Sequence, residues 1–126
     1  MRHAKLGRKL GRKTANRKAL MMNLASSLIE HKKIKTTDAK AKELRRFIEP
    51  LITFAKKGDI HSRRQVLKKI PHKPVVRELF DKIGPQYSER NGGYTRIIKL
   101  GFRENDCAPI SLIELVDFLS NSVEAG

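Results

Sequence analysis

The side chains in this chain with a clear chemical role are the cations at its N-terminus. Eight Lys or Arg residues fall within positions 1–18, and the first carboxylate of the chain is Glu30. Cations at this density repel one another unless a polyanion neutralises them, so this stretch indicates anion binding. The residues expected to make these contacts are Arg2, His3, Lys5, Arg8, Lys9, Arg12, Lys13, Arg17 and Lys18.

Catalytic and metal chemistry find weaker support. Residues 7–14 partly resemble a phosphate-binding P-loop, but the glycine spacing is one residue short and Arg12 separates Gly11 from Lys13. No Ser, Cys or acid pair forms a nucleophile or acid–base motif, so we expect no enzyme. The four histidines show no i, i+4 spacing, and we expect them at the surface, without metal or any other cofactor.

Cys107 is the only cysteine of the chain. A lone cysteine excludes an internal disulfide and any zinc site built on several cysteines, and it suits a reducing cytosol. We expect its side chain to act as a small apolar filler.

The composition favours one small domain with a large acidic partner, for which nucleic acid and an anionic membrane both qualify. The chain has 126 residues, a net charge of +15 and a sequence pI near 10.4, with 39% hydrophobic and 6% aromatic residues. These values predict one modest aliphatic core. No apolar run is long enough for a membrane span or a signal peptide. A mitochondrial transit peptide is a rival interpretation of the basic start, although Gly7 and Gly11 would weaken its amphipathic helix.

The basic stretch leads into a domain whose helices and strands must position these cations. Residues 1–13 are expected to form a basic arm, 14–118 a single domain and 119–126 a frayed tail. Thr14 or Asn16 can cap a helix over about 15–32. Arg17 and Lys18 have the wrong charge sign for its N-terminus, which indicates that phosphate approaches there.

Strand 33–37 is followed by a helix that Thr37 or Asp38 can cap and that ends at Gly58. Its apolar stripe continues past Pro50, which favours one bent helix over two short ones. A third helix begins after Asp59 and stops before Pro71, and a fourth opens at Pro74 and ends before Gly84. The basic residues of the third helix lie either in solvent or on RNA; they are Arg63, Arg64, Lys68 and Lys69.

Strands over 94–102 and 110–118 form an antiparallel hairpin around loop 103–107, joined by strand 33–37. The fold class is therefore α+β, with helices on one side of a small three-stranded sheet that is mixed or antiparallel, and with an extended basic N-terminal arm. Strand parity places Ile98, Leu100 and Phe102 on the buried face with Arg96 at its rim. Lys99 and Arg103 then face outward, either on RNA or in solvent, and Lys33 and Lys35 are further RNA candidates. For Tyr87 and Tyr94, packing in the core is favoured over stacking on a base.

Short motifs along nearly the whole chain resemble the bacterial large-subunit ribosomal protein seventeen family. In the first half these are Met-Arg-His at 1–3, Gly-Arg-Lys-Leu at 7–10, Arg-Lys-Ala at 17–19, Ile-Lys-Thr-Thr at 34–37, Ala-Lys-Glu-Leu-Arg-Arg at 41–46 and Glu-Pro-Leu-Ile-Thr at 49–53. In the second half they are Gly-Pro at 84–85, Glu-Arg at 89–90, Gly-Gly-Tyr at 92–94, Arg-Ile at 96–97, Ala-Pro at 108–109 and Glu-Leu-Val-Asp at 114–117.

The resemblance implies a small α+β domain held by 23S ribosomal RNA in the large subunit, beside neighbouring ribosomal proteins in the cytoplasm. It implies no catalysis, no membrane and no small-molecule substrate. A small architectural DNA-binding protein is the alternative, because a basic arm can also enter a minor groove. That alternative lacks a recognisable helix-turn-helix pair.

Overall fold

The N-terminal half of the chain folds into three helices and one short strand. The computed structural model describes residues 14–118, so the predicted arm at 1–13 and tail at 119–126 lie outside the described residues. Helix α1 covers Thr14–His31, strand β1 Lys33–Thr37, helix α2 Asp38–Lys57 and helix α3 Ile60–Lys69. All four predicted elements are confirmed, with bounds close to those expected.

Side-chain caps and a glycine define where these helices start and stop. The Thr37 hydroxyl accepts a hydrogen bond from the Lys40 amide at 3.4 Å, and the Asp59 carboxylate accepts one from the Ser62 amide at 2.8 Å. Gly58 ends α2 in the left-handed conformation, with φ of 73°. Helix α2 runs through Pro50 as a single element, as the continuous apolar stripe predicts.

The fourth helical segment is longer than predicted. It consists of α4 (Lys73–Glu78), the π-helical turn η2 (Leu79–Ile83) and α5 (Gly84–Gln86), so the expected end before Gly84 is wrong. Gly84 is a place of close helix contact, because a Cβ added there would lie 2.6 Å from the carbonyl oxygen of Ala55. The wider η2 turn buries Leu79 and Ile83 just before this contact.

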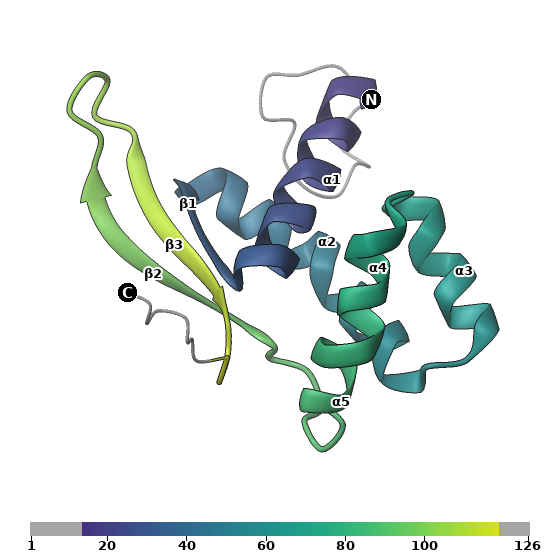
Figure 1. The fold of residues 1–126 in the computed structure, drawn as a ribbon. Helices are drawn as coiled ribbons and strands as arrows, with labels where there is room; N and C mark the ends of the chain where they lie inside the picture. Colours follow the sequence, from purple (N-terminus) through teal and green to yellow (C-terminus); the bar gives the residue numbers. More distant parts are fainter. Residues whose placement is uncertain (1–13, 119–126) are drawn as a thin grey trace, which may run out of the picture.

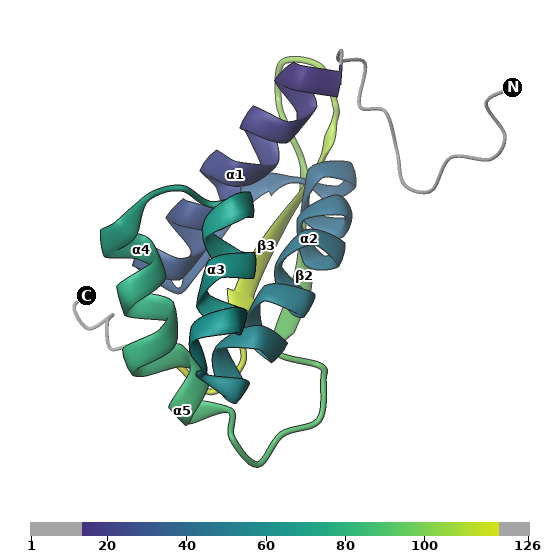
Figure 2. The same ribbon diagram turned by 90° about the vertical axis from the view of Figure 1, so that its right-hand side faces the viewer.

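The three strands form an antiparallel sheet in the order β1-β3-β2, which confirms the predicted fold class. Strand β2 covers Thr95–Phe102 and β3 covers Pro109–Leu115, so β3 ends before the predicted residue 118. The helices cover one face of the sheet, as Figure 1 shows. Helices α1 and α2 contact the strands, and α3 packs on α2 and α4 further out (Figure 2).

The predicted faces of β2 are wrong. Thr95 is only 3% exposed and faces the helices, whereas Ile98, Leu100 and Phe102 are 40%, 50% and 74% exposed. The register shifts between Lys99 and Gly101, and the β2–β3 hairpin extends past the ends of the helices (Figure 1). Thr95 and Ile97 face the helices, so Ile98 lies on the open face before the register shift. Beyond the shift the strand extends past its covering helices, which leaves Leu100 and Phe102 exposed.

Two tyrosines pack where the sheet meets the helices. Tyr87 is 1% exposed and Tyr94 is 2% exposed, which confirms core packing over base stacking for both. The Tyr87 hydroxyl donates to the Val116 carbonyl at 2.5 Å and to the Tyr94 carbonyl at 3.3 Å. Burial raises the pKa of Tyr87 far above its ordinary value, so this phenol stays protonated and keeps donating.

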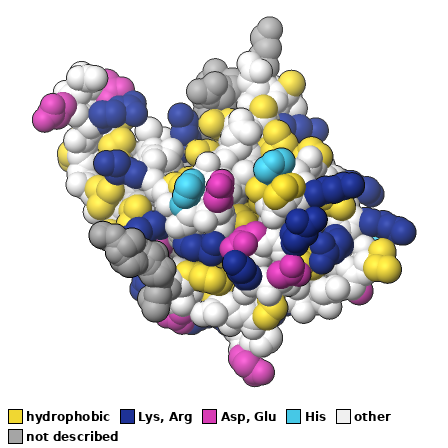
Figure 3. All heavy atoms as spheres, in the orientation of Figure 1, with side chains coloured by type: hydrophobic (Ala, Val, Ile, Leu, Met, Phe, Trp, Pro, Cys, Tyr) yellow, Lys and Arg dark blue, Asp and Glu magenta, His cyan; other side chains and the backbone are white. Residues whose placement is uncertain are grey.

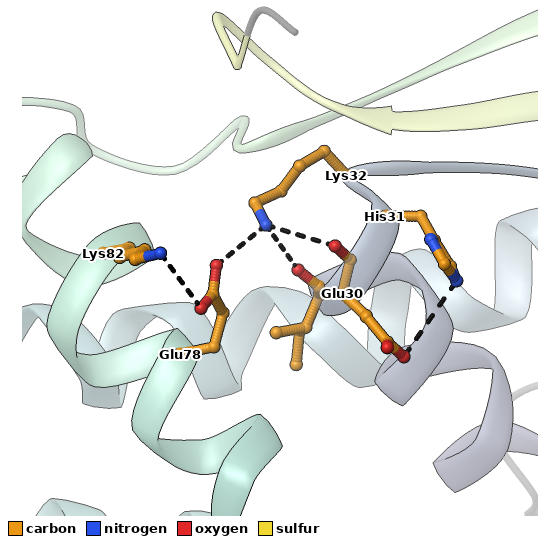
Figure 4. Close-up of polar contacts among 6 residues, drawn as sticks. Glu30, His31, Lys32, Glu78 and Lys82 are labelled. Carbon is orange, nitrogen blue, oxygen red and sulfur yellow. Dashed lines mark hydrogen bonds and ion pairs between the residues drawn. The ribbon is translucent and has the colours of Figure 1, made fainter. Parts of the chain in front are cut away.

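A charged contact joins the C-terminal end of α1 to α4 (Figure 4). Lys32 leaves α1 at φ of 71°, and its Nζ donates to the Ile29 carbonyl and to Glu78 Oε2, each at 2.9 Å. Lys82 lies 3.6 Å from the other Glu78 oxygen. Burial raises the pKa of Glu78, but the two lysines outweigh it and leave the pKa below its ordinary value.

Candidate nucleic-acid interface

The start of α1 is basic, as the sequence predicts. Arg17 is half-buried, Lys18 is exposed, and the first described turn of this helix carries no acid. Positive charge at a helix N-terminus opposes the helix dipole and is tolerated best where an anion approaches. Lys18 therefore remains the best-placed described residue of the predicted basic segment.

Lys18 lines a groove together with lysines from another helix. We call this the lysine groove: Lys18 and Met22 of α1, Phe47 of α2, and Lys68 and Lys69 of α3 line a hollow of about 520 Å³. The rim lysines are exposed, and Met22 and Phe47 are half-buried. The structure thus places Lys18, a predicted contact residue, in the same groove as Lys68 and Lys69. For those two lysines the sequence allowed either solvent or RNA.

The outer helices carry further cations. In Figure 3, Lys and Arg side chains gather over α3 and α4 on the right of the molecule. Arg64 is exposed there, whereas Arg63 is half-buried and lies 4.7 Å from the centre of the Phe80 ring. Arg63 is therefore engaged in packing through a cation–π contact, and Arg64 is freely accessible to an anion.

Lys33 and Lys35 lie on the open face of the sheet, away from the lysine groove. In the strand register, Lys33 and Arg96 both lie opposite Glu114, and Arg96 Nε donates to Glu114 at 2.9 Å. Arg96 is consequently on the open face, not at the rim of the buried one as predicted. Lys35 lies opposite Leu112, so this face mixes charge with apolar surface.

Lys99 and Arg103 do not form the outward pair that strand parity predicts. Lys99 lies opposite Ser111, whose side chain is buried, so Lys99 is on the helix side of the sheet although it is exposed. Arg103 belongs to the hairpin turn, where its guanidinium lies 2.8 Å from Asp106 and holds the pKa of that carboxyl at about 2. Arg103 is thus already paired with a carboxylate of its own turn.

The hairpin turn also holds Cys107, which corrects the expected apolar filler. Its side chain is exposed and its φ is 59°, so it belongs to the turn and not to the core. His31, His61 and His72 are exposed, as predicted. Within residues 14–118, no three His, Cys, Asp or Glu side chains gather in a way that could hold a metal ion.

The predicted contact residues therefore occupy three separate places: the lysine groove region, the open sheet face and the hairpin. Sequence reasoning could not unite Lys18 with Lys68 and Lys69, because only the packing of α1 and α3 against α2 brings them together. The remaining predicted residues are outside the described part of the chain: Arg2, His3, Lys5, Arg8, Lys9, Arg12 and Lys13. None of the helices described in 14–118 has the length and apolarity to cross a membrane.

Comparison with known proteins gives one consistent result. The family model described as Ribosomal protein L17 matches residues 20–116. A protein of Geobacter sulfurreducens named "Large ribosomal subunit protein bL17" is 57% identical over 93% of this chain and 67% of its own length. Proteins of the same name from Pelobacter propionicus and Syntrophus aciditrophicus are 56% and 48% identical, over 93% and 97% of this chain and 92% and 98% of theirs.

Proposed function

Because this chain belongs to the ribosomal protein L17 family, we propose that it is a structural constituent of the large ribosomal subunit, not an enzyme. It binds 23S ribosomal RNA and sits beside neighbouring large-subunit proteins in the bacterial cytoplasm. The supporting observation is that exposed Lys18 of α1 lines one groove with exposed Lys68 and Lys69 of α3.

Binding on this proposal is mainly electrostatic. Lys and Arg contacts to phosphate fix the position of a protein on RNA but carry little sequence information, so the shape of the folded RNA supplies the specificity. The cations of 1–18 and the lysine groove bind phosphate, while Lys33 and Lys35 offer a second, weaker surface. The matched family and relatives are ribosomal, which leaves the architectural DNA-binding alternative without support.

The decisive experiment compares the full chain with a variant that lacks residues 2–13. We expect the deletion to leave the circular dichroism spectrum of the domain nearly unchanged and to abolish most binding to 23S ribosomal RNA. If the basic segment makes about six phosphate contacts, the affinity of the full chain should fall roughly a thousandfold from 50 to 200 mM salt.

A tagged copy expressed in bacteria provides the second readout. It should sediment with the large-subunit fraction at low salt, and its absence from that fraction would overturn the proposal. Equal affinity for duplex DNA and structured RNA would instead favour the architectural alternative.

A further inference from the structure

We propose that the lysine groove holds a single-stranded stretch of ribosomal RNA, with one unstacked base on Phe47 and Met22 and its phosphates on Lys18, Lys68 and Lys69. The inference rests on the RNA binding proposed above and assigns it a specific place and mode. It is carried by the combination of an apolar floor and a cationic rim in one hollow.

The floor of the groove offers a surface that phosphate alone would not need. Phe47 and Met22 pack against the core on their inner sides and remain half-exposed on their outer sides. Every nucleotide base has an apolar π-face, and stacking on an aromatic ring is the usual way in which proteins hold an unpaired base. A groove that bound only duplex phosphate would gain nothing from this floor.

The rim supplies charge of one sign. Its three lysines come from two helices, and the side chains of 14–118 that line the groove include no carboxylate. An ammonium on a long flexible stem can follow a bending backbone, which suits a single strand. A nucleotide strand matches both parts of the groove, with its bases toward the floor and its phosphates toward the rim.

The position of the groove favours RNA over an acidic peptide. Thr14, the first described residue of α1, lies about one helical turn before Lys18, and six further Lys or Arg residues precede it in the sequence. A polyanion that binds the cations of that stretch is thereby close to Lys18 in sequence. An acidic apolar peptide would have to compete with that RNA for the same lysines.

The first test removes the charge of the rim. In the double variant Lys68→Ala/Lys69→Ala, two phosphate contacts are lost from the 23S ribosomal RNA complex. At about 0.7 counterions per contact to a single strand, affinity in 0.1 M salt should fall roughly 25-fold and the salt slope should decrease by about 1.4. The matched control is Lys57→Ala/Arg77→Ala, which removes the same charge at two exposed residues that do not line the groove.

The second test reports on the floor itself. The chain contains no tryptophan, so Phe47→Trp introduces a single indole into the groove that can be excited apart from the two tyrosines. We expect 23S ribosomal RNA to quench this indole through stacking, and we expect poly-glutamate to leave its emission nearly unchanged. Phe47→Leu keeps an apolar side chain but removes the ring, and it should weaken RNA binding at least about fivefold.

The outcomes separate this inference from the proposed function. Failure of the unmodified chain to bind 23S ribosomal RNA would overturn the proposed function. The groove proposal fails, while the proposed function stands, if the unmodified chain binds but both double variants lose the same affinity. It also fails if saturating RNA does not quench the indole. Quenching by poly-glutamate that depends on Lys68 and Lys69 would assign the groove to an acidic peptide instead. Circular dichroism of each variant shows whether the fold is intact.

Discussion

Gly84 lets α5 approach α2 more closely than any side chain would allow. A Cβ at this position would meet the Ala55 carbonyl oxygen at 2.6 Å, the Ala55 carbonyl carbon at 2.9 Å and the Ala55 Cβ at 3.2 Å. The shortest contact is with backbone, which cannot move aside as the tip of a flexible side chain can.

We therefore expect Gly84→Ala to lower the free energy of unfolding by about 1–3 kcal/mol, the usual cost of overpacking a core. Urea denaturation measures this change. Adding Ala55→Gly should not restore stability, because the backbone oxygen remains in place. Full rescue by that second substitution would show that the clash is with the Ala55 side chain instead.

Asp38 gives the domain a pH-dependent contribution to stability. The Ser111 hydroxyl donates to this carboxylate at 2.8 Å and Lys42 lies 3.2 Å away, which together hold the pKa of Asp38 below its ordinary value. A carboxyl with a lowered pKa in the folded state stabilises it above the unfolded pKa near 3.9. That contribution is lost as the pH falls through the folded-state pKa.

The variant Asp38→Asn can still accept the Ser111 hydrogen bond but cannot ionise. We expect its unfolding free energy to fall less between pH 6 and pH 2.5 than that of the unmodified protein. Urea titrations at both pH values measure this difference. Asp81→Asn, at an exposed acid, is the control, and an equal effect of both substitutions would remove Asp38 as the source.

At the scale of elements, Glu49 fastens the sheet to the helices. Its Oε2 accepts hydrogen bonds from the Tyr94 amide and the Thr95 amide at 3.1 Å and from the Thr95 hydroxyl at 2.9 Å. Lys56, two turns further along α2, donates to the Arg90 carbonyl and to the Tyr94 hydroxyl. Two side chains of α2 thus hold the segment that leads into β2.

Glu49→Ala should reduce the unfolding free energy by about 2–4 kcal/mol, because partly buried backbone donors lose a charged acceptor. Glu49→Gln retains an acceptor oxygen and should cost clearly less. Amide hydrogen exchange provides the local readout, since the protection of Tyr94 and Thr95 should drop in Glu49→Ala. Unchanged protection at both amides would contradict this role.

Elements with local signals could be predicted from the sequence, and those set by packing could not. Thr37, Asp59 and Gly58 mark helix ends through their own side chains or backbone, so their positions were predictable. The continuation of the helix through Gly84 depends on α2 lying alongside it. The exposure of Ile98 depends on which face of β2 the helices cover, and that of Phe102 on a bulge and on how far the helices reach. The alternation of β2 alone encodes neither.

The same distinction between local signals and packing applies to the candidate site. The sequence indicates the basic start of α1 because Arg17 and Lys18 are adjacent to the other cations of that stretch. The partnership of Lys18 with Lys68 and Lys69 depends on the packing of helices distant in sequence. Likewise, the pairing of Arg103 with Asp106 is a property of the turn geometry.

At the scale of the whole molecule, the net charge of +15 sets two opposite salt responses. Like charges repel in the folded protein, and added salt screens that repulsion while it also screens attraction to a polyanion. Without RNA, we expect the melting temperature to rise by a few degrees between 10 and 200 mM sodium chloride. RNA affinity should fall over the same range. Thermal melts and filter binding measure the two trends, and a melting temperature that falls with salt would show that ion pairs dominate.

The strand order β1-β3-β2 also has a consequence in time. The middle strand, β3, is the last of the three to be synthesised, and it supplies the hydrogen-bonding partner for both of the others. Lys33 in β1 must wait for Glu114, more than half the chain later, before its strand is paired. A nascent chain that stops before residue 109 lacks the strand that pairs with both others, so we expect the sheet to form only after β3 has been synthesised.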